Sequence, residues 1–325
     1  MSQAFETTKL GHHVDAYLAH WRALGRRYRQ EEWLLRAVTR DLAALGHDDL
    51  TAQSHDLWLE LKKDRHPNSR RKWAQRLRHF CLFRRRLSPE CFVPGPEQAC
   101  KRRPHVTPII VGDDEVAKLL LTADRLTPAP GSPLRAATMR IATVLLYTTG
   151  IRLGELQRLR LSDVEDDGSI LRIRASKFQK TRLVPLSLTA QAELADFMVL
   201  RTSAGFAIVP STALLAPHPG RSNGYSISGL QSAITALFRN ASVNDGNGRC
   251  PRIHDLRHSF AIQVLTRAYR EGDDVQVLLP KLAMYMGHVS IESTAYYLQW
   301  REELGILASE RFATRFADVI SGRPS

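Results

Sequence analysis

Six residues between positions 152 and 297 have the side chains needed to cut a phosphodiester bond. They comprise two arginines, a lysine, two histidines and a tyrosine: Arg152, Lys177, His254, Arg257, His288 and Tyr297. Guanidinium groups can bind the non-bridging phosphate oxygens in pairs as negative charge builds there. A general acid must protonate the departing 5′ oxygen, and a ring nitrogen can orient the nucleophile or move its proton. Tyrosine is a weak nucleophile at its ordinary pKa of about 10, so nearby cations would be needed to favour the phenolate. The set predicts strand cleavage that needs no metal ion or other cofactor.

The local sequences around these residues support a common site. Arg152 lies in TGIRLGEL, directly after an apolar segment, and Lys177 lies in the polar turn of SKFQKTRLVPL. In IHDLRHSF, His254 and Arg257 are three residues apart and would share one face of a helix. His288 and Tyr297 lie in YMGHVSIESTAYYLQW, on either side of a predicted turn and short helix that could bring both into one cleft. Any one of these residues alone would more often have a structural role, but six in order favour a catalytic site.

The elements that would position these groups are mostly helices. Residues 1–95 predict about four helices, because apolar side chains recur at helical spacing at Leu34, Leu35, Val38, Leu42, Leu45, Trp73, Leu77 and Phe80. Two further helices are expected near 12–24 and 50–63. The Pro- and Gly-rich stretch 96–112 is predicted to be a basic linker to a larger domain at 113–325.

The larger domain is predicted to combine helices with one small β-sheet. Asp113 and Asp114 can cap a helix that runs through Leu121. An apolar helix should end at Gly150, a residue type that is common just past helix ends. Residues 169–188 alternate apolar and polar side chains around a polar turn, as in a β-hairpin, and helices are expected near 189–202 and 226–240. The fold class is therefore expected to be mostly α with a small β-sheet (α+β).

The charge of the chain favours a nucleic-acid partner. Its formal net charge is +13, and its pI is near 10.0. A dense basic series occupies the last helix of the first domain, and a shorter one lies in the linker. The residues expected to contact DNA are Arg70, Arg71, Lys72, Arg76, Arg78, Lys101, Arg102 and Arg103. The alternative for the helix is an ordinary solvated charged face.

The remaining features predict a cytoplasmic protein. No run of apolar residues is long enough to cross a bilayer, and the first residues do not form a secretory signal, so no membrane partner is expected. The four cysteines form no CxxC pair, which is typical of a reducing compartment and gives no metal site.

Taken together, the four motifs resemble the catalytic signature of the tyrosine recombinase (phage integrase) family. The resemblance covers roughly residues 106–300 and rests on TGIRLGEL, on the hairpin lysine followed by RLVPL, on HDLRH, and on GH followed by a tyrosine. It implies an N-terminal helical core-binding domain joined to a catalytic domain that carries all six residues.

The resemblance also implies a role for each residue. Arg152 and Arg257 would clamp the scissile phosphate, and Glu155 would support the site. Lys177 would protonate the leaving oxygen, with Lys180 as the alternative. His254 would assist proton transfer, and His288 would hydrogen-bond to the phosphate. Tyr297 would be the nucleophile, because its distance from the GH histidine matches the family's spacing better than that of Tyr296 does.

The implied reaction passes through a 3′-phosphotyrosyl intermediate on double-stranded DNA that carries specific recombination sites. Four protomers would act on two such sites. The segment between Arg257 and His288 is longer than in Xer-type members and is similar to recombinases of transposon-like elements, some encoded as adjacent trios, so companion recombinases are a further implied partner. A type IB topoisomerase and a catalytically silent DNA-binding protein are the alternatives.

Overall fold

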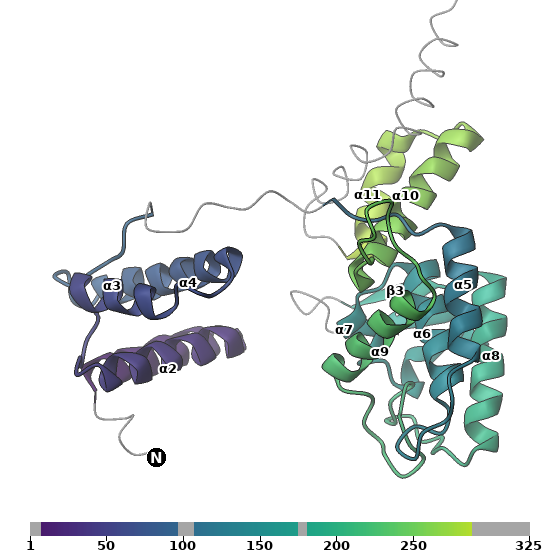
Figure 1. Ribbon diagram of the computed structural model, residues 1–325, viewed down its shortest axis with the longest axis horizontal. Coiled ribbons are helices and arrows are strands. Elements are labelled where there is room, and N and C mark those ends of the chain that lie inside the picture. Colours follow the sequence, from purple (N-terminus) through teal and green to yellow (C-terminus); the bar gives the residue numbers. More distant parts are fainter. Residues whose placement is uncertain (1–7, 97–106, 175–180, 288–325) are drawn as a thin grey trace, which may run out of the picture. The chain divides into compact units, whose positions relative to one another are not determined.

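The computed structural model describes residues 8–96, 107–174 and 181–287, and it is mostly helical with one small sheet (Figure 1). The predicted α+β class is confirmed. The chain divides into two compact units, Met1–Val106 and Thr107–Ser325. Nothing among the described helices is long and apolar enough to cross a membrane.

The described part of the first unit consists of four helices, the number that the sequence predicts. They are α1 (Lys9–Ala23), α2 (Arg29–Ala44), α3 (Ala52–Leu61) and α4 (Pro67–Arg85). Their apolar faces enclose a core that includes Trp58, Leu77 and Phe80. Leu45 departs from the prediction. It follows the end of α2 and is 46% exposed, because the chain reverses at Gly46 in a left-handed conformation.

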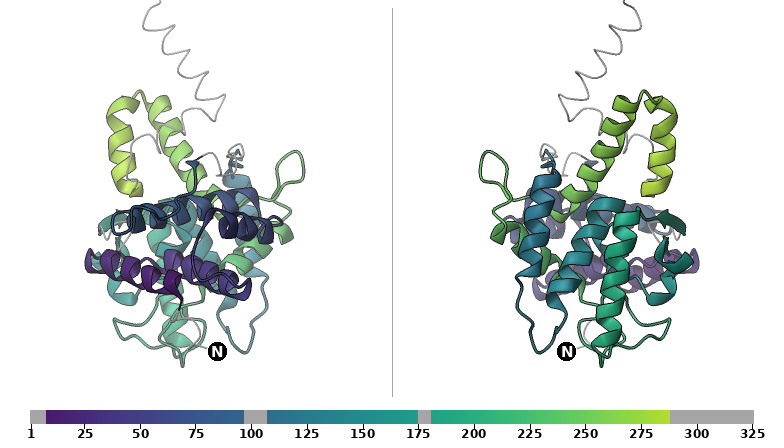
Figure 2. Two further views of the ribbon diagram at one scale, coloured as in Figure 1. Left: turned by 90° about the vertical axis from the view of Figure 1, so that its left-hand side faces the viewer. Right: turned by 90° about the vertical axis from the view of Figure 1, so that its right-hand side faces the viewer.

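The second unit is built around α6 (Arg135–Thr149), which lies between α5 (Asp113–Asp124) and α8 (Leu188–Ser203) and also contacts α10 (Figures 1 and 2). The other described helices of this unit are α7 (Leu153–Leu156), α9 (Ile227–Asn240), α10 (Ile253–Glu271) and α11 (Val275–Met286). The apolar segment therefore forms a buried helix that ends before Gly150, as predicted, and this helix is the centre of the core.

A three-stranded antiparallel sheet lies beside these helices. Its order is β1 (Val164–Glu165), β2 (Ile170–Ile173) and β3 (Arg182–Pro185). β2 and β3 form the predicted hairpin, with Ile173 opposite Arg182. β1 was not predicted, because a strand of two residues has no readable alternation. Short 3-10 turns, η3 (Leu161–Asp163) and η4 (Asp166–Gly168), flank it.

The start of α5 differs from the prediction in its capping residue. The cap is Gly112, and the carboxylate of Glu115 in the first turn accepts the Gly112 N–H at 3.0 Å. Asp113 and Asp114 lie one and two positions inside the helix, where their charges favour its positive end. An acid at the third helical position thus replaces the side-chain cap.

The second unit begins six residues before the predicted domain start of 113. Val111 is buried in the core of this unit, and its N–H donates to Ser259 Oγ on α10 at 2.8 Å. The apolar run at 108–111 therefore belongs to the folded unit and not to a linker.

Candidate active site

The first part of the candidate site is the turn that joins α6 to α7. Arg152 directly precedes α7, and Glu155 lies in the first turn of that helix. The Glu155 carboxylate accepts the Arg152 N–H at 2.9 Å and one guanidinium nitrogen of Arg152 at 2.8 Å. The acid three residues after the arginine therefore starts the helix and also holds the arginine side chain.

Gly150 lets another helix approach this turn. It has a left-handed conformation (φ +60°), and a Cβ placed on it would lie 2.5 Å from Cδ1 of Phe260 on α10. The Gly150 carbonyl accepts a hydrogen bond from Arg257, also on α10. Glycine is required here for both the backbone conformation and the close packing.

Arg257 is among the most deeply buried charged side chains, with 2% of its surface exposed. His254 lies one helical turn earlier and forms an edge-to-face contact with His258 at 4.7 Å between ring centroids. Burial, followed by the charge of Arg257, lowers the pKa of His254 to about 4. His254 is therefore neutral near pH 7, and a neutral imidazole can accept a proton. His254, Arg257 and Leu153 contribute to the lining of a cavity of about 490 Å³.

Three arginines from separate segments meet at the C-terminal end of α11. Arg182 Nε donates to the Tyr285 carbonyl at 2.7 Å, Arg257 Nη2 to the Met286 carbonyl at 2.6 Å, and Arg152 Nη2 to the Gly287 carbonyl at 2.8 Å. The last carbonyls of a helix lack partners within the helix and carry partial negative charge. Cationic donors therefore cap α11, and the cap brings Arg152 and Arg257 together.

Arg182 is a site residue that the sequence analysis missed. Its guanidinium group pairs with both carboxylate oxygens of Glu155, at 2.8 and 3.1 Å. Burial alone would raise the pKa of Glu155, but hydrogen bonds from Arg182 and Arg152 outweigh burial and lower it to about 2. The alternation of side chains along the strand could have revealed Arg182. It lies on the same face of β3 as the buried Val184, and a charged side chain on a buried face needs a partner of opposite charge.

The structure thus brings together Arg152, Glu155, His254 and Arg257 from the predicted set. The other predicted catalytic residues, Lys177, His288 and Tyr297, lie outside the described residues, as do the alternatives Lys180 and Tyr296. His288 is the residue that follows Gly287 in the chain, and Lys177 belongs to the connection between β2 and β3.

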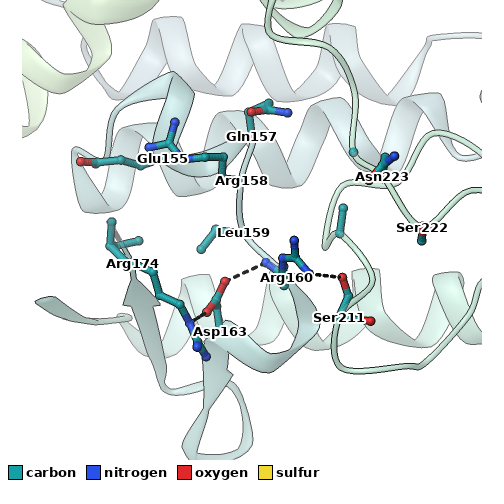
Figure 3. A pocket seen from close by; sticks show the side chains of 13 residues that line it. Glu155, Gln157, Arg158, Leu159, Arg160, Asp163, Arg174, Ser211, Ser222 and Asn223 are labelled. Carbon is teal, nitrogen blue, oxygen red and sulfur yellow. Dashed lines mark hydrogen bonds and ion pairs between the residues drawn. The ribbon is translucent and has the colours of Figure 1, made fainter. Parts of the chain in front are cut away.

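A second cavity, of about 480 Å³, is lined in part by Glu155 and is rich in arginine (Figure 3). Arg158, Arg160 and Arg174 line it. Asp163 lies between the last two: its carboxylate accepts the Arg160 N–H and the Arg174 guanidinium. Arg158 is exposed, so this cavity offers a cation beside the candidate site.

The basic series on α4 is divided between surface and interior. Lys72 is exposed, and Arg70 and Arg71 are half-buried. Arg76 pairs with Glu31 on α2 at 3.1 Å, and Arg78 donates to the Pro94 carbonyl. Arg84, which continues the same series, is buried and pairs with Asp49 at 2.6 Å, so it has a structural role. Lys101, Arg102 and Arg103 lie outside the described residues.

Comparison with known proteins places the chain in a family. The model of the "Phage integrase family" matches residues 111–303. A protein of Sinorhizobium fredii named "Putative integrase/recombinase y4rE" is 32% identical over 302 residues, which are 93% of this chain and 95% of that protein.

Two solved structures share the fold at low sequence identity. A lambda integrase tetramer bound to a Holliday junction has a TM-score of 0.57 and 20% identity, covering 93% of this chain and 80% of that one. XerH recombinase bound to palindromic difH substrate has a TM-score of 0.59 and 14% identity, covering 90% of this chain and 79% of that one.

The family match covers more than half of the chain and includes every motif described above. The chain therefore belongs to the phage integrase family of tyrosine recombinases.

Proposed function

We propose that this protein cleaves and rejoins DNA at specific sites through a covalent link to Tyr297. The observation that carries the proposal is the meeting of Arg152 and Arg257 at the end of α11, one residue before His288 in the chain. These arginines are 105 residues apart in the sequence (257 minus 152), so only the fold brings them together. Two guanidinium groups at one place are suited to a phosphate group.

The first step is attack by the Tyr297 hydroxyl on phosphorus. The P–O5′ bond breaks, a 3′-phosphotyrosyl bond forms, and the free strand end carries a 5′ hydroxyl. Lys177 supplies the proton for the departing oxygen, and His254 assists the transfer of the phenolic proton. Arg152 and Arg257 stabilise the charge that builds on the phosphate, with His288 as a further donor.

The second step reverses the first on a different strand. The 5′ hydroxyl of a partner strand attacks the phosphotyrosyl bond, releases Tyr297 and restores a phosphodiester. One phosphodiester-type bond is exchanged for another in each step, so the scheme needs no nucleotide hydrolysis and uses side chains only.

The substrate that we propose is double-stranded DNA that carries two recombination sites, bound by four protomers. Two solved structures with this fold support the proposal: a lambda integrase tetramer bound to a Holliday junction, and XerH bound to difH. The arginine-lined cavity and the exposed cations of α4 supply positive charge for the phosphate backbone. A mobile element is the proposed context, with companion recombinases as further partners.

The test is covalent trapping in EDTA. Nicked duplexes that carry the ends of the element encoding the protein would be used, because a short strand diffuses away after cleavage and religation fails. Wild-type protein and Tyr296→Phe should form a DNA-linked species that survives denaturation, and Tyr297→Phe should form none. An adduct that persists in Tyr297→Phe would refute the assignment of the nucleophile. Tight DNA binding by the wild type without an adduct would favour a catalytically silent scaffold.

A further inference from the structure

A third arginine, Arg182, binds the end of α11 in addition to the two predicted phosphate-binding arginines. Arg182 holds the Tyr285 carbonyl and both oxygens of Glu155, and Glu155 in turn holds Arg152. One guanidinium group therefore connects the hairpin strand β3, the start of α7 and the end of α11. The side chains are poorly exposed, 11% for Arg182 and 2% for Glu155, so water is a weak competitor for these bonds.

We propose that Arg182 is a positioning residue that locks the end of α11 to the Arg152–Glu155 pair and so sets where the chain enters residue 288. This inference rests on the proposed function. Arg182 does not contact the reacting atoms in this scheme. It fixes the direction in which Arg152 presents its remaining donors, and it fixes the origin of the segment that carries His288 and Tyr297.

The geometry at Gly287 supports this role. Gly287 ends α11 in a left-handed conformation (φ +66°), and a Cβ placed there would lie 3.0 Å from Nη1 and 3.2 Å from Cζ of Arg182. The guanidinium group therefore lies directly against the backbone that leads into residue 288. A side chain at this glycine would compete with Arg182 for the same space, so Gly287→Ala should reproduce the effect of losing Arg182.

A lysine cannot replace this arginine fully. Arg182 uses three nitrogen atoms for three acceptors held in fixed directions, whereas an ammonium group is a single point donor. Arg182→Lys keeps the positive charge beside Glu155 but loses the set of three directed donors. Arg182→Met loses both the charge and the donors. Arg172→Met is the matched control, because Arg172 lies on the same hairpin and pairs with Glu165 on a more exposed face, away from α11.

The first measurement is hydrogen exchange of full-length protein without DNA. In Arg182→Met, amides in the last turn of α11 should exchange roughly tenfold faster, because charge-assisted bonds to that turn are lost. The α6 amides should be unchanged, and Arg172→Met should match the wild type. Unchanged exchange at α11 in Arg182→Met would overturn the proposal. This arm needs no enzymatic activity, so it separates failure of the proposal from failure of the proposed function.

The second measurement is the single-turnover rate of adduct formation on the nicked duplex, with DNA affinity measured in parallel. Arg182→Met should cleave roughly 100-fold more slowly at unchanged DNA affinity, since a misplaced catalytic group costs about that factor. Arg182→Lys should recover part of the rate. A full wild-type rate in Arg182→Met, or a loss explained by weaker DNA binding, would overturn the positioning role.

A 5′-bridging phosphorothiolate duplex separates this role from one in leaving-group protonation. Its thiolate leaves without a proton, so any defect transmitted through the hairpin lysine should disappear on it. The Arg182→Met defect should persist, because the proposal acts through Arg152 and the end of α11. Restoration of the wild-type rate would show that Arg182 acts through the hairpin instead.

Discussion

The Glu155 carboxylate is a fixed negative charge inside a cluster of three arginines. Its pKa of about 2 means that it stays charged over the whole range in which the protein would work. It also accepts hydrogen bonds from a backbone N–H and from two guanidinium groups. A neutral side chain of the same shape could accept only part of these bonds.

Glu155→Gln should therefore slow adduct formation by roughly 10–100-fold, because the amide cannot hold Arg152 and Arg182 in both directions. DNA affinity should change little, since the variant removes no cation. Single-turnover cleavage with a parallel binding titration measures both quantities. As a matched control, Glu193→Gln breaks a similar pair with Arg140, away from the site, and should leave the cleavage rate unchanged. Equal effects of the two variants would contradict a local role for Glu155.

His254 and His258 make the second unit sensitive to acid. Burial is the first cause that lowers the pKa of both imidazoles to about 4, from about 6.5 in the unfolded chain. Protonation therefore favours the unfolded state. The stabilisation is fully present above about pH 6.5, and it is lost as the pH falls towards 4.

Calorimetry between pH 7 and pH 4.5 should show the free energy of unfolding of this unit falling with pH. The slope is roughly 1.4 kcal/mol per pH unit for each histidine within that window. His254→Gln should reduce the slope. A variant slope as steep as that of the wild type would mean that His254 is not the group being titrated.

At the scale of elements, local signals predicted the helices and the hairpin, whereas long-range contacts were invisible. Gly150 showed the end of α6 because left-handed glycines are common there. Arg182 was missed because its partners are 27 residues away at Glu155 and 103 residues away at Tyr285. No spacing within β3 reports such contacts. The motifs predicted which residues would gather, but only the fold shows that the end of α11 holds them.

The close contact between α6 and α10 makes Gly150 sensitive to substitution. Gly150→Ala must adopt φ near +60° and displace Phe260, so it should destabilise the unit by roughly 2–4 kcal/mol. Gly205→Ala is the control. It has φ +74° but nothing within 4 Å of the added Cβ, so it should cost only about 1 kcal/mol. Denaturant unfolding of both variants measures the loss of free energy of unfolding. Equal losses would show that Phe260 moves aside at no cost in stability.

At the scale of the whole molecule, the charge of +13 predicts DNA binding that weakens steeply with salt. The α4 series shows that a count of cations overstates the DNA-binding surface, because Arg84 is buried in an ion pair.

Lys72→Gln should lower the slope of log K for DNA binding against log salt concentration by about 1 at unchanged stability. Arg84→Met should leave that slope unchanged and destabilise the protein by roughly 3 kcal/mol. Filter binding at several salt concentrations distinguishes the two, and identical behaviour of the variants would refute this division.

The fixed position of Gly287 sets a limit on the reach of the nucleophile. Tyr297 follows Gly287 by ten residues (297 minus 287), and a fully extended chain advances at most about 3.6 Å per residue. The Cα atom of Tyr297 can therefore lie no more than about 36 Å from that glycine. In an assembly where the tyrosine serves a neighbouring protomer, the neighbour's phosphate must lie within that radius plus the length of one side chain. The arginines that hold α11 thus fix the centre of a sphere at Gly287 of each protomer, and a protomer can supply its tyrosine to a neighbouring active site only where that site's phosphate lies inside this sphere.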